Sequence, residues 1–318
     1  MSEQRQRIHK FLKDWMLVIG MVAGAGIYLI YHSIPVLHTA GPCLERCCKS
    51  IQPTLLFAML FLTFCKIEPK DLRPHRWQAW LLLIQCGLFA GLALLLAGCD
   101  GLSHRAGLES LMLCLICPTA TACAVVTGKL GGDMAGVVTY TILINVLVAI
   151  LVPTFVPMIH PMEGLTFFSA FFRILAKVFP LLIMPCLAAW FVRYLLPSFH
   201  SWLLKFPNLS FYIWSVCLTI AILMSTRALV HTEDSISIVL DIAVASLSAC
   251  IFQFWAGKRI GRQYGQEITA GQSLGQKNTV FGIWMGYTFL DPVTSVACGF
   301  YSIWHNIYNT WQLHKAGK

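Results

Sequence analysis

The sequence predicts an all-α membrane protein of ten transmembrane helices, and three observations support that prediction. The chain has 318 residues, of which 57% are hydrophobic and only 12% are charged, whereas a soluble domain carries about 25% charge. Its mean hydropathy is +0.70. Ten apolar runs can be drawn, most of them near the roughly 20 residues that cross a bilayer as a helix. No polar stretch is long enough for a soluble domain, so we expect one integral membrane domain over residues 1–318.

The runs follow one another with short connections, and the second is the shortest. Their expected limits are 14–33, 51–65, 77–98, 107–126, 134–157, 166–195, 210–228, 235–256, 268–287 and 292–312. The first run follows a charged start, as a signal peptide does. It is long, however, and no clear A-x-A cleavage site follows, so we expect an uncleaved helix.

The basic residues set the expected orientation. The net charge is +9, which by itself would suit a nucleic-acid partner. With the N-terminus inside, 16 of the 23 Lys and Arg residues fall in inner loops and tails, and six fall outside. This bias follows the positive-inside rule. We therefore expect an inner-membrane protein with both termini cytoplasmic and no nucleic-acid partner.

Runs four and nine are interrupted in the middle. The first interruption covers residues 116–123, around Pro118, and the second covers residues 270–279, with Gly271 and Gly275. The two runs lie five apart, which predicts two inverted five-helix repeats, about 14–157 and 166–312. Paired interruptions of this kind point to the binding site of a secondary transporter. The alternative is that Pro and Gly are simply commoner in membrane helices.

Lys277 lies in the second interruption, at the depth of the membrane. A charge there is costly and marks a functional site by default. Three interpretations stay open. The ammonium is a fixed positive charge in place of a coupling cation, or a proton carrier, because burial makes a lysine titratable. Otherwise the side chain extends from a helix end to the membrane surface.

Two further polar residues lie inside apolar runs, at positions that the spacing of the repeats matches. They are Gln85 in run three and Asp241 in run eight. Asp241 should face the bundle, where it would pair with Lys277, relay protons, or bond a neighbouring Ser or backbone group. Asp133 and Asp291 precede helices, and we expect helix caps or turn residues there.

The 13 cysteines are mostly inside apolar runs, where a thiol behaves as a small hydrophobe. Cys117 and Cys123 flank the first interruption and would suit a soft metalloid such as arsenite, or simply let crossing helices approach closely. Cys43, Cys47 and Cys48 are expected in the first outer loop. One disulfide would form there, or with Cys99, if that side is oxidising.

Three motifs resemble those of the bile acid:sodium symporter family. The family's fourth helix breaks at P-G-G-T-A-S-N, and residues 118–124 here read Pro-Thr-Ala-Thr-Ala-Cys-Ala. Its ninth helix breaks at E-x-G-x-Q-N-S/T, and residues 273–279 read Ser-Leu-Gly-Gln-Lys-Asn-Thr. Its tenth helix often holds Trp-His-Asn, found at residues 304–306.

The resemblance implies a core of helices 3–5 and 8–10 beside a panel of helices 1, 2, 6 and 7. The broken helices 4 and 9 would cross in the core, and substrate would pass between core and panel by alternating access. The family's sodium ligands are replaced here by Cys123, Ala124, Ser273 and Lys277, and the carboxylate is missing. Oxygen ligands that remain are Gln85, Thr121, Thr141, Gln272 and Gln276, with Gln85, Thr121, Gln272 and Gln276 as the candidate sodium set.

These observations favour a transporter that moves an organic anion, bile-acid-like or a small carboxylate, by ion-coupled symport with Na⁺ as the family's coupling ion. The alternatives are an H⁺-coupled or ion-independent carrier that uses Lys277, an arsenite-type efflux carrier, and an intramembrane enzyme, for which catalytic motifs are missing. No other cofactor is expected, and the partners are the anion and the bilayer. The candidate binding residues are Gln85, Pro118, Thr119, Thr121, Cys123, Thr141, Asp241, Gln272, Ser273, Gln276, Lys277, Asn278 and Thr279.

Overall fold

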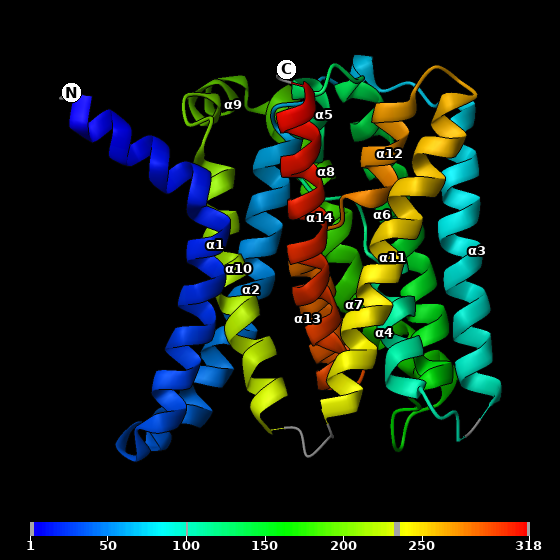
Figure 1. Ribbon diagram of the computed structural model, residues 1–318. Helices are drawn as coiled ribbons and strands as arrows, with labels where there is room; N and C mark the ends of the chain where they lie inside the picture. Colours follow the sequence, from blue (N-terminus) through cyan, green and yellow to red (C-terminus); the bar gives the residue numbers. More distant parts are fainter. Residues whose placement is uncertain (1–2, 100, 232–235, 317–318) are drawn as a thin grey trace.

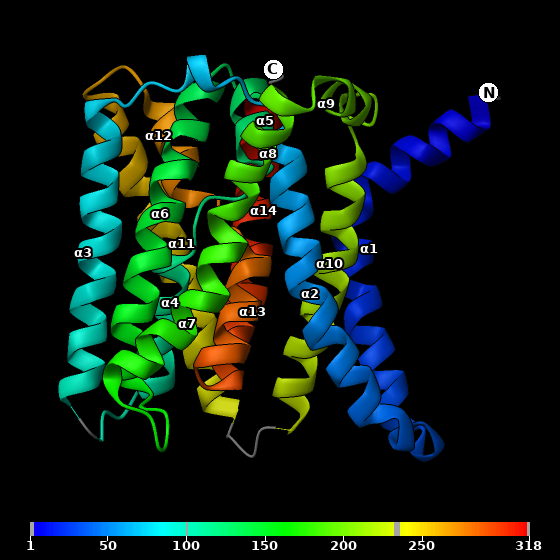
Figure 2. The ribbon, with the colours of Figure 1, turned by 180° about the vertical axis from the view of Figure 1, so that it is seen from behind.

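The computed structural model describes residues 3–99, 101–231 and 236–316, and within them the chain is a bundle of α-helices (Figures 1 and 2). The all-α prediction is confirmed. In the first half the helices are α1 (Glu3–Ser33), α2 (Gly41–Phe64), α3 (Arg76–Gly98), α4 (Arg105–Ile116), α5 (Cys123–Lys129) and α6 (Met134–Ile159). In the second half they are α7 (Phe167–Leu182), α8 (Met184–Leu195), α9 (Pro197–Leu204), α10 (Leu209–His231), α11 (Ile236–Arg262), α12 (Glu267–Gly275), α13 (Thr279–Phe289) and α14 (Val296–Ala316).

Five of these helices are long and apolar enough to cross a membrane, namely α2, α3, α6, α10 and α11. A sixth span is formed if α7 and α8 are counted together, since they pass the same test as a pair bent by 41°. Pro185 lies in the first turn of α8, where a missing backbone N–H costs no hydrogen bond. The run predicted as one segment over residues 166–195 is therefore bent at Ile183.

The helices pack as two neighbouring groups. On one side α10 lies between α1 and α2, and α2 also packs against α7 and α8. On the other side α11 packs against α4, α12 and α14, while α3 packs against α4 and α6. The α6–α7 contact joins the groups. Figure 1 shows α1 and α3 at opposite edges, and both ends of the chain on the same side of the bundle.

Both predicted interruptions are present, and each is shorter than the sequence suggested. Residues 117–122 separate α4 from α5, and residues 276–278 separate α12 from α13. Gly271, Gln272 and Ser273 lie within α12, so Gly271 does not interrupt the helix. Its lack of a side chain instead leaves room for the stem of Lys258, which lies 2.6 Å from where a Cβ would be.

Small residues let α11 approach α12. Gly257 and Gly261 are four residues apart on one face of α11, the spacing that brings membrane helices close together. A Cβ on Gly257 would lie 2.6 Å from the carbonyl oxygen of Ala270, and one on Gly261 would overlap Gln266. The close contact holds the first half of the second broken helix against α11.

The prediction for the cysteine cluster was wrong. Cys43, Cys47 and Cys48 lie in the first two turns of α2 and not in a loop. The helix begins ten residues earlier than expected and continues past Pro53, as membrane helices tolerate when neighbouring helices support the freed backbone groups. All 13 cysteines are free thiols, so the structure contains no disulfide between this cluster and Cys99.

Candidate functional site

The two breaks meet in the middle of the bundle. Thr119 and Lys277 form an antiparallel β-bridge. The amide of Asn278 donates to the carbonyl of Pro118 at 2.8 Å, and the amide of Ala120 donates to the carbonyl of Gln276 at 2.9 Å. The Thr119 hydroxyl also donates to the carbonyl of Ser273 at 2.8 Å. Each interruption therefore satisfies backbone groups of the other, which non-helical chain at membrane depth requires.

Glutamine and tyrosine side chains satisfy the last carbonyls of the half-helices that enter the breaks. Before the first break, Gln85 on α3 donates to the carbonyls of Ile116 (3.3 Å) and Cys117 (3.0 Å), and it accepts from the Tyr140 hydroxyl at 2.6 Å. These bonds use carbonyls that a continuing helix would have satisfied. Gln85, one of the candidate ligands, therefore already supports the end of α4.

A second glutamine–tyrosine pair lies at the second break. Tyr301 on α14 donates to the carbonyl of Gly275 at 2.8 Å. Gln253 on α11 donates to the Tyr301 hydroxyl (3.1 Å) and to the carbonyl of Cys114 (3.3 Å). Sequence reasoning missed Gln253, Tyr140 and Tyr301. Gln253 carried a usable signal, because it is a polar residue inside an apolar run, as Gln85 is.

Lys277 is the charged residue at the crossing. Its side chain is among the largest that are fully buried, with 1% of its surface exposed. Its Nζ has no hydrogen-bond partner among the described residues. The interpretation in which the lysine reaches the membrane surface is therefore wrong, because the ammonium lies inside the protein.

Other polar atoms within five residues of Lys277 in the sequence are also buried without a partner in the described structure. They are Gln272 Oε1, Ser273 Oγ, Gln276 Oε1 and Asn278 Nδ2. Buried polar atoms are nearly always hydrogen-bonded, and exceptions gathered in one place call for an explanation. The opposite side of the Gln272 amide donates to Asn309 (3.0 Å) and Gln312 (3.2 Å) on α14, two further residues that the sequence did not single out.

The second half-helix after the break begins next to the lysine. Asn278 is the N-cap of α13, and its side chain accepts from the amide of Phe281 at 3.2 Å. Thr279, the first residue of α13, is buried. The N-terminus of a helix carries a partial positive charge. A lysine and a helix N-terminus, two positive features, therefore follow each other directly in the chain.

The remaining candidates lie near the crossing but are held in other ways. Thr121 is partly exposed in the first break. Cys123, fully buried at the start of α5, has Thr127 Oγ1 at 3.9 Å from its sulfur. The Thr141 hydroxyl donates to the carbonyl of Val137 in its own helix at 2.9 Å.

Asp241 does not pair with Lys277, and the match between Gln85 and Asp241 that the repeat spacing suggested is wrong. Asp241 Oδ2 lies 2.7 Å from His104 Nδ1, and the two side chains are partly exposed near the ends of α11 and α4. Counting along the chain failed because the two halves differ in length between the polar residue and the break. Asp133 and Asp291 do cap helices as predicted, accepting from Ala135 (2.9 Å) and Val293 (3.1 Å).

The thiols do not form a metal site by geometry. Cys117 lies 3.7 Å from Cys298, sulfur to sulfur, and not beside Cys123. Among the described residues, no group of three or more His, Cys, Asp or Glu side chains is arranged to hold a metal ion. In the segment from Gln272 to Asn278 the buried oxygens without a partner are those of Gln272, Ser273 and Gln276, and the charged residue of this segment is a lysine rather than an acid.

A protein-family model described as Sodium Bile acid symporter family matches residues 53–232. The match covers more than half of the chain and includes the first break with α3, α4, α5 and α6. A comparison with curated protein sequences gave no match.

Proposed function

The chain belongs to the sodium bile acid symporter family, whose members are membrane transporters, and from this premise we propose that it carries an organic anion with Lys277 as the fixed cation of its site. The observation that supports the proposal is the buried Nζ without a partner at the crossing of the two breaks. A buried ammonium without an acceptor is costly, and a carboxylate or sulfate bound beside it would offset that cost.

The proposed architecture has ten transmembrane segments in two inverted repeats, residues 14–157 and 166–312, within one domain. Segments four, six and nine would each consist of two helices: α4 with α5, α7 with α8, and α12 with α13. Two observations support the repeat: each half contributes one broken segment to the crossing, and each half supplies a Gln–Tyr pair to a half-helix end. Both termini would face the cytoplasm, across the inner membrane.

The anion would bind at the start of α13, where its charge meets Lys277 and the helix end, while Gln276 and Asn278 orient it. Freed backbone groups and half-helix ends serve this purpose in transporters with broken helices. Alternating access would then move the helices of the core (α3–α6 and α11–α14) past the panel (α1, α2, α7, α8 and α10). A network on the side opposite the termini would have to open in this cycle. In it Glu45 of α2 accepts from Arg227 of α10 (2.9 Å) and Tyr287 of α13 (3.1 Å).

Sodium symport is the second candidate, and the unbonded oxygens of Gln272, Ser273 and Gln276 favour it. The charge argues against it. A sodium ion among these oxygens would lie beside the Lys277 ammonium, and like charges in a medium of low dielectric constant repel strongly. A lysine that releases its proton to admit the ion would make the carrier depend on pH as well as on Na⁺.

The test is initial uptake into proteoliposomes, measured against Na⁺ concentration and against pH for the wild type and Lys277→Gln. The substrate comes first from a thermal-shift panel of a bile acid, a keto acid, pantoate and a sulfated steroid, each in NaCl and in choline chloride. A ligand at a hundred times its Kd stabilises the protein by about 2.7 kcal/mol. We expect Na⁺-independent uptake by the wild type and at least a hundredfold loss in Lys277→Gln. A steep Na⁺ dependence that persists in the variant would contradict the proposal.

A further inference from the structure

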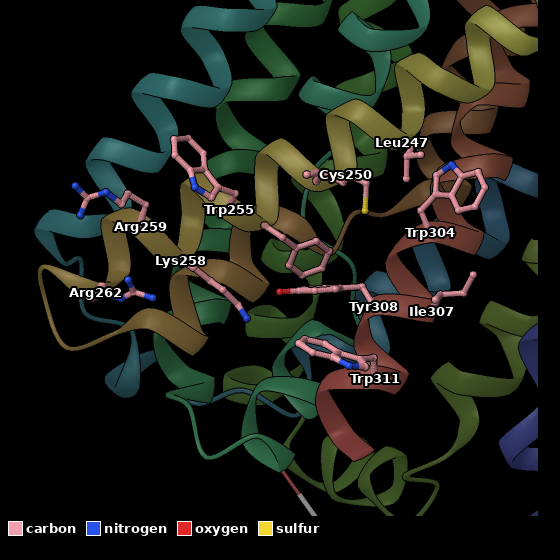
Figure 3. Close-up of a pocket in the computed structure, with 12 residues that line it drawn as sticks. Leu247, Cys250, Trp255, Lys258, Arg259, Arg262, Trp304, Ile307, Tyr308 and Trp311 are labelled. Atoms are coloured by element: carbon pink, nitrogen blue, oxygen red, sulfur yellow. The ribbon is translucent and has the colours of Figure 1, made fainter. Parts of the chain in front are cut away.

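A groove lies between α11 and α14, with a volume of about 570 Å³. Its residues are Leu247, Cys250, Ile251, Phe254, Trp255, Lys258, Arg259 and Arg262 from α11, and Trp304, Ile307, Tyr308 and Trp311 from α14. Figure 3 shows the aromatic rings of both helices around it, with the Lys258 side chain reaching in toward Tyr308. Most of this lining is apolar, and the charged side chains are all at one end.

The two helices carry the same pattern in the same direction. On α11 the positions Leu247, Ile251 and Trp255, each four residues on, lead to Arg259. Residues four apart lie on one face of a helix. On α14 the positions 304, 307 and 311 lead in the same way to Lys315. Both helices end on the side of the termini (Figure 1), so the two apolar stripes and their two basic ends lie side by side.

The length of the stripes fits one leaflet of a bilayer. From Leu247 to Arg259 is about 18 Å at 1.5 Å per residue, and from Trp304 to Lys315 is about 17 Å. The hydrocarbon of one leaflet is about 15 Å deep, half of the bilayer core. An acyl chain along the groove would therefore bring its headgroup to the level of the basic residues, where tryptophan also commonly lies.

The side chains of the groove face outward from the bundle. Ile251 and Ile307 are 62% and 60% exposed, and Trp255 and Trp311 are 61% and 53% exposed. Exposed apolar side chains are ordinary on a membrane protein, so the basic end decides which lipid is favoured. The ammonium of Lys258 lies 5.2 Å from the centre of the Tyr308 ring. Arg259 is exposed and makes no ion pair in the described structure, whereas Arg262 is paired with Glu267 at 2.7 Å.

We propose that this groove binds an anionic phospholipid from the leaflet on the side of the termini, with the headgroup phosphate on Lys258 and Arg259. Basic residues near a membrane surface attract acidic lipid, and here two of them lie at the end of an aromatic channel for the acyl chain. The site is separate from the proposed substrate site, and it does not depend on which anion is carried.

The groove nevertheless adjoins the second break through one side chain, that of Phe254. Phe254 forms part of its wall, with its ring 4.4 Å from that of Tyr308. The same ring contacts Gly275, the last residue of α12, so tightly that a Cβ there would overlap it. A lipid held between α11 and α14 would therefore brace the element that places Lys277.

The experiment compares phosphatidylglycerol with phosphatidylcholine of the same acyl chains, added to purified protein in detergent. Native mass spectrometry counts the lipids retained. The test variant is Lys258→Gln/Arg259→Gln. Its matched control is Arg73→Gln/Lys205→Gln, which removes one lysine and one arginine, both exposed. Arg73 precedes α3 and Lys205 follows α9, and the start of α3 and α9 both lie on the side of the termini (Figure 1). We expect at least a tenfold loss of phosphatidylglycerol retention in the test variant, little change in the control, and unchanged phosphatidylcholine retention.

The thermal midpoint without added lipid shows whether each variant folds. If the double variant does not, Arg259→Gln alone repeats the test at an exposed position. Equal losses in test and control variants, or equal retention of the two lipids by the wild type, would overturn the proposal. It would also be overturned if the variant left lipid retention unchanged and altered the oligomeric state, because the groove would then be an interface between copies.

Discussion

The two breaks are stabilised in the same way but carry different side chains. Each half-helix that enters a break ends on a Gln–Tyr pair, Gln85 with Tyr140 in the first half and Gln253 with Tyr301 in the second. The first break then offers small side chains. One of its two threonines, Thr119, already donates to the carbonyl of Ser273. The second break offers Lys277 and several polar atoms that have no partner in the described structure.

This difference bears on which break stabilises the fold and which break would bind a ligand. Backbone groups of both breaks are satisfied by each other and by the Gln–Tyr pairs, so the crossing holds without a ligand. Of the two breaks, the second is the one whose described side chains include buried polar atoms without a partner, on Gln276, Lys277 and Asn278. Residues that violate the rule that buried polar groups are bonded are expected at functional sites. In the proposed carrier, the asymmetry would give the first break mainly a structural part and the second mainly the binding part.

The largest expected effects are two opposite changes in the free energy of unfolding, at Lys277 and Thr119, the two residues of the β-bridge. Lys277→Met keeps much of the side chain's volume and removes an unpaired buried amine, so the free energy of unfolding should rise by about 2 kcal/mol. Thr119→Val removes the donor to Ser273 and should lower it by about 1 kcal/mol. Thermal unfolding in detergent without substrate measures both. A loss of stability in Lys277→Met would mean that the lysine has a partner in the resting protein.

The next effect tests how tightly the two halves fit at the crossing. Gly282 on α13 faces Cys117 of the first break and Cys298 of α14, and a Cβ would overlap both sulfur atoms. Gly282→Ala should therefore destabilise the protein by about 2 kcal/mol through overpacking. The added change Cys298→Ala makes room and should restore part of that loss.

A matched control for this change is Gly87→Ala on α3, where an added Cβ meets nothing within 4 Å. Replacing a glycine inside a helix without a clash should leave stability unchanged or raise it by up to about 1 kcal/mol. If Gly282→Ala behaved like the control, the packing of α13 against the first break would be looser than the contacts indicate.

Much of the fold could be predicted from composition, because a run of about 20 apolar residues has few alternatives to a membrane helix. The breaks could be predicted from Pro118 and Gly275. Their exact limits could not, since Gly271 was counted as an interruption although it serves close packing. The start of α2 was also missed, because Pro53 and the polar residues before it look like a loop in sequence.

The site was predicted in part. Lys277 was identified because a charge inside an apolar run is rare and costly. Gln253, the counterpart of Gln85 in the second half, was not identified, because Asp241 was matched to Gln85 by counting residues. Thr119 follows Gln85 by 34 residues, whereas Lys277 follows Gln253 by only 24. The half-helix α4 has 12 residues and α12 has nine, so depth in the membrane does not follow a constant offset. Tyr140 and Tyr301 gave no signal, since a tyrosine in an apolar run is ordinary.

The smallest expected effect concerns Glu45, the acid that links α2 to α10 and α13 on the side opposite the termini. Its carboxylate contacts Arg227 (2.9 Å), Lys49 (2.7 Å) and Tyr287 (3.1 Å). Because the group is partly exposed, Glu45→Gln should cost less than about 1 kcal/mol. Salt screens such pairs, so raising choline chloride from 0.05 to 1 M should lower the unfolding midpoint of the wild type more than that of the variant. As a control, Glu68→Gln removes another exposed ion pair, the one with Lys70. It should leave the response of the unfolding midpoint to salt unchanged. An identical salt response in Glu45→Gln and the wild type would mean that this network does not hold the two groups of helices together.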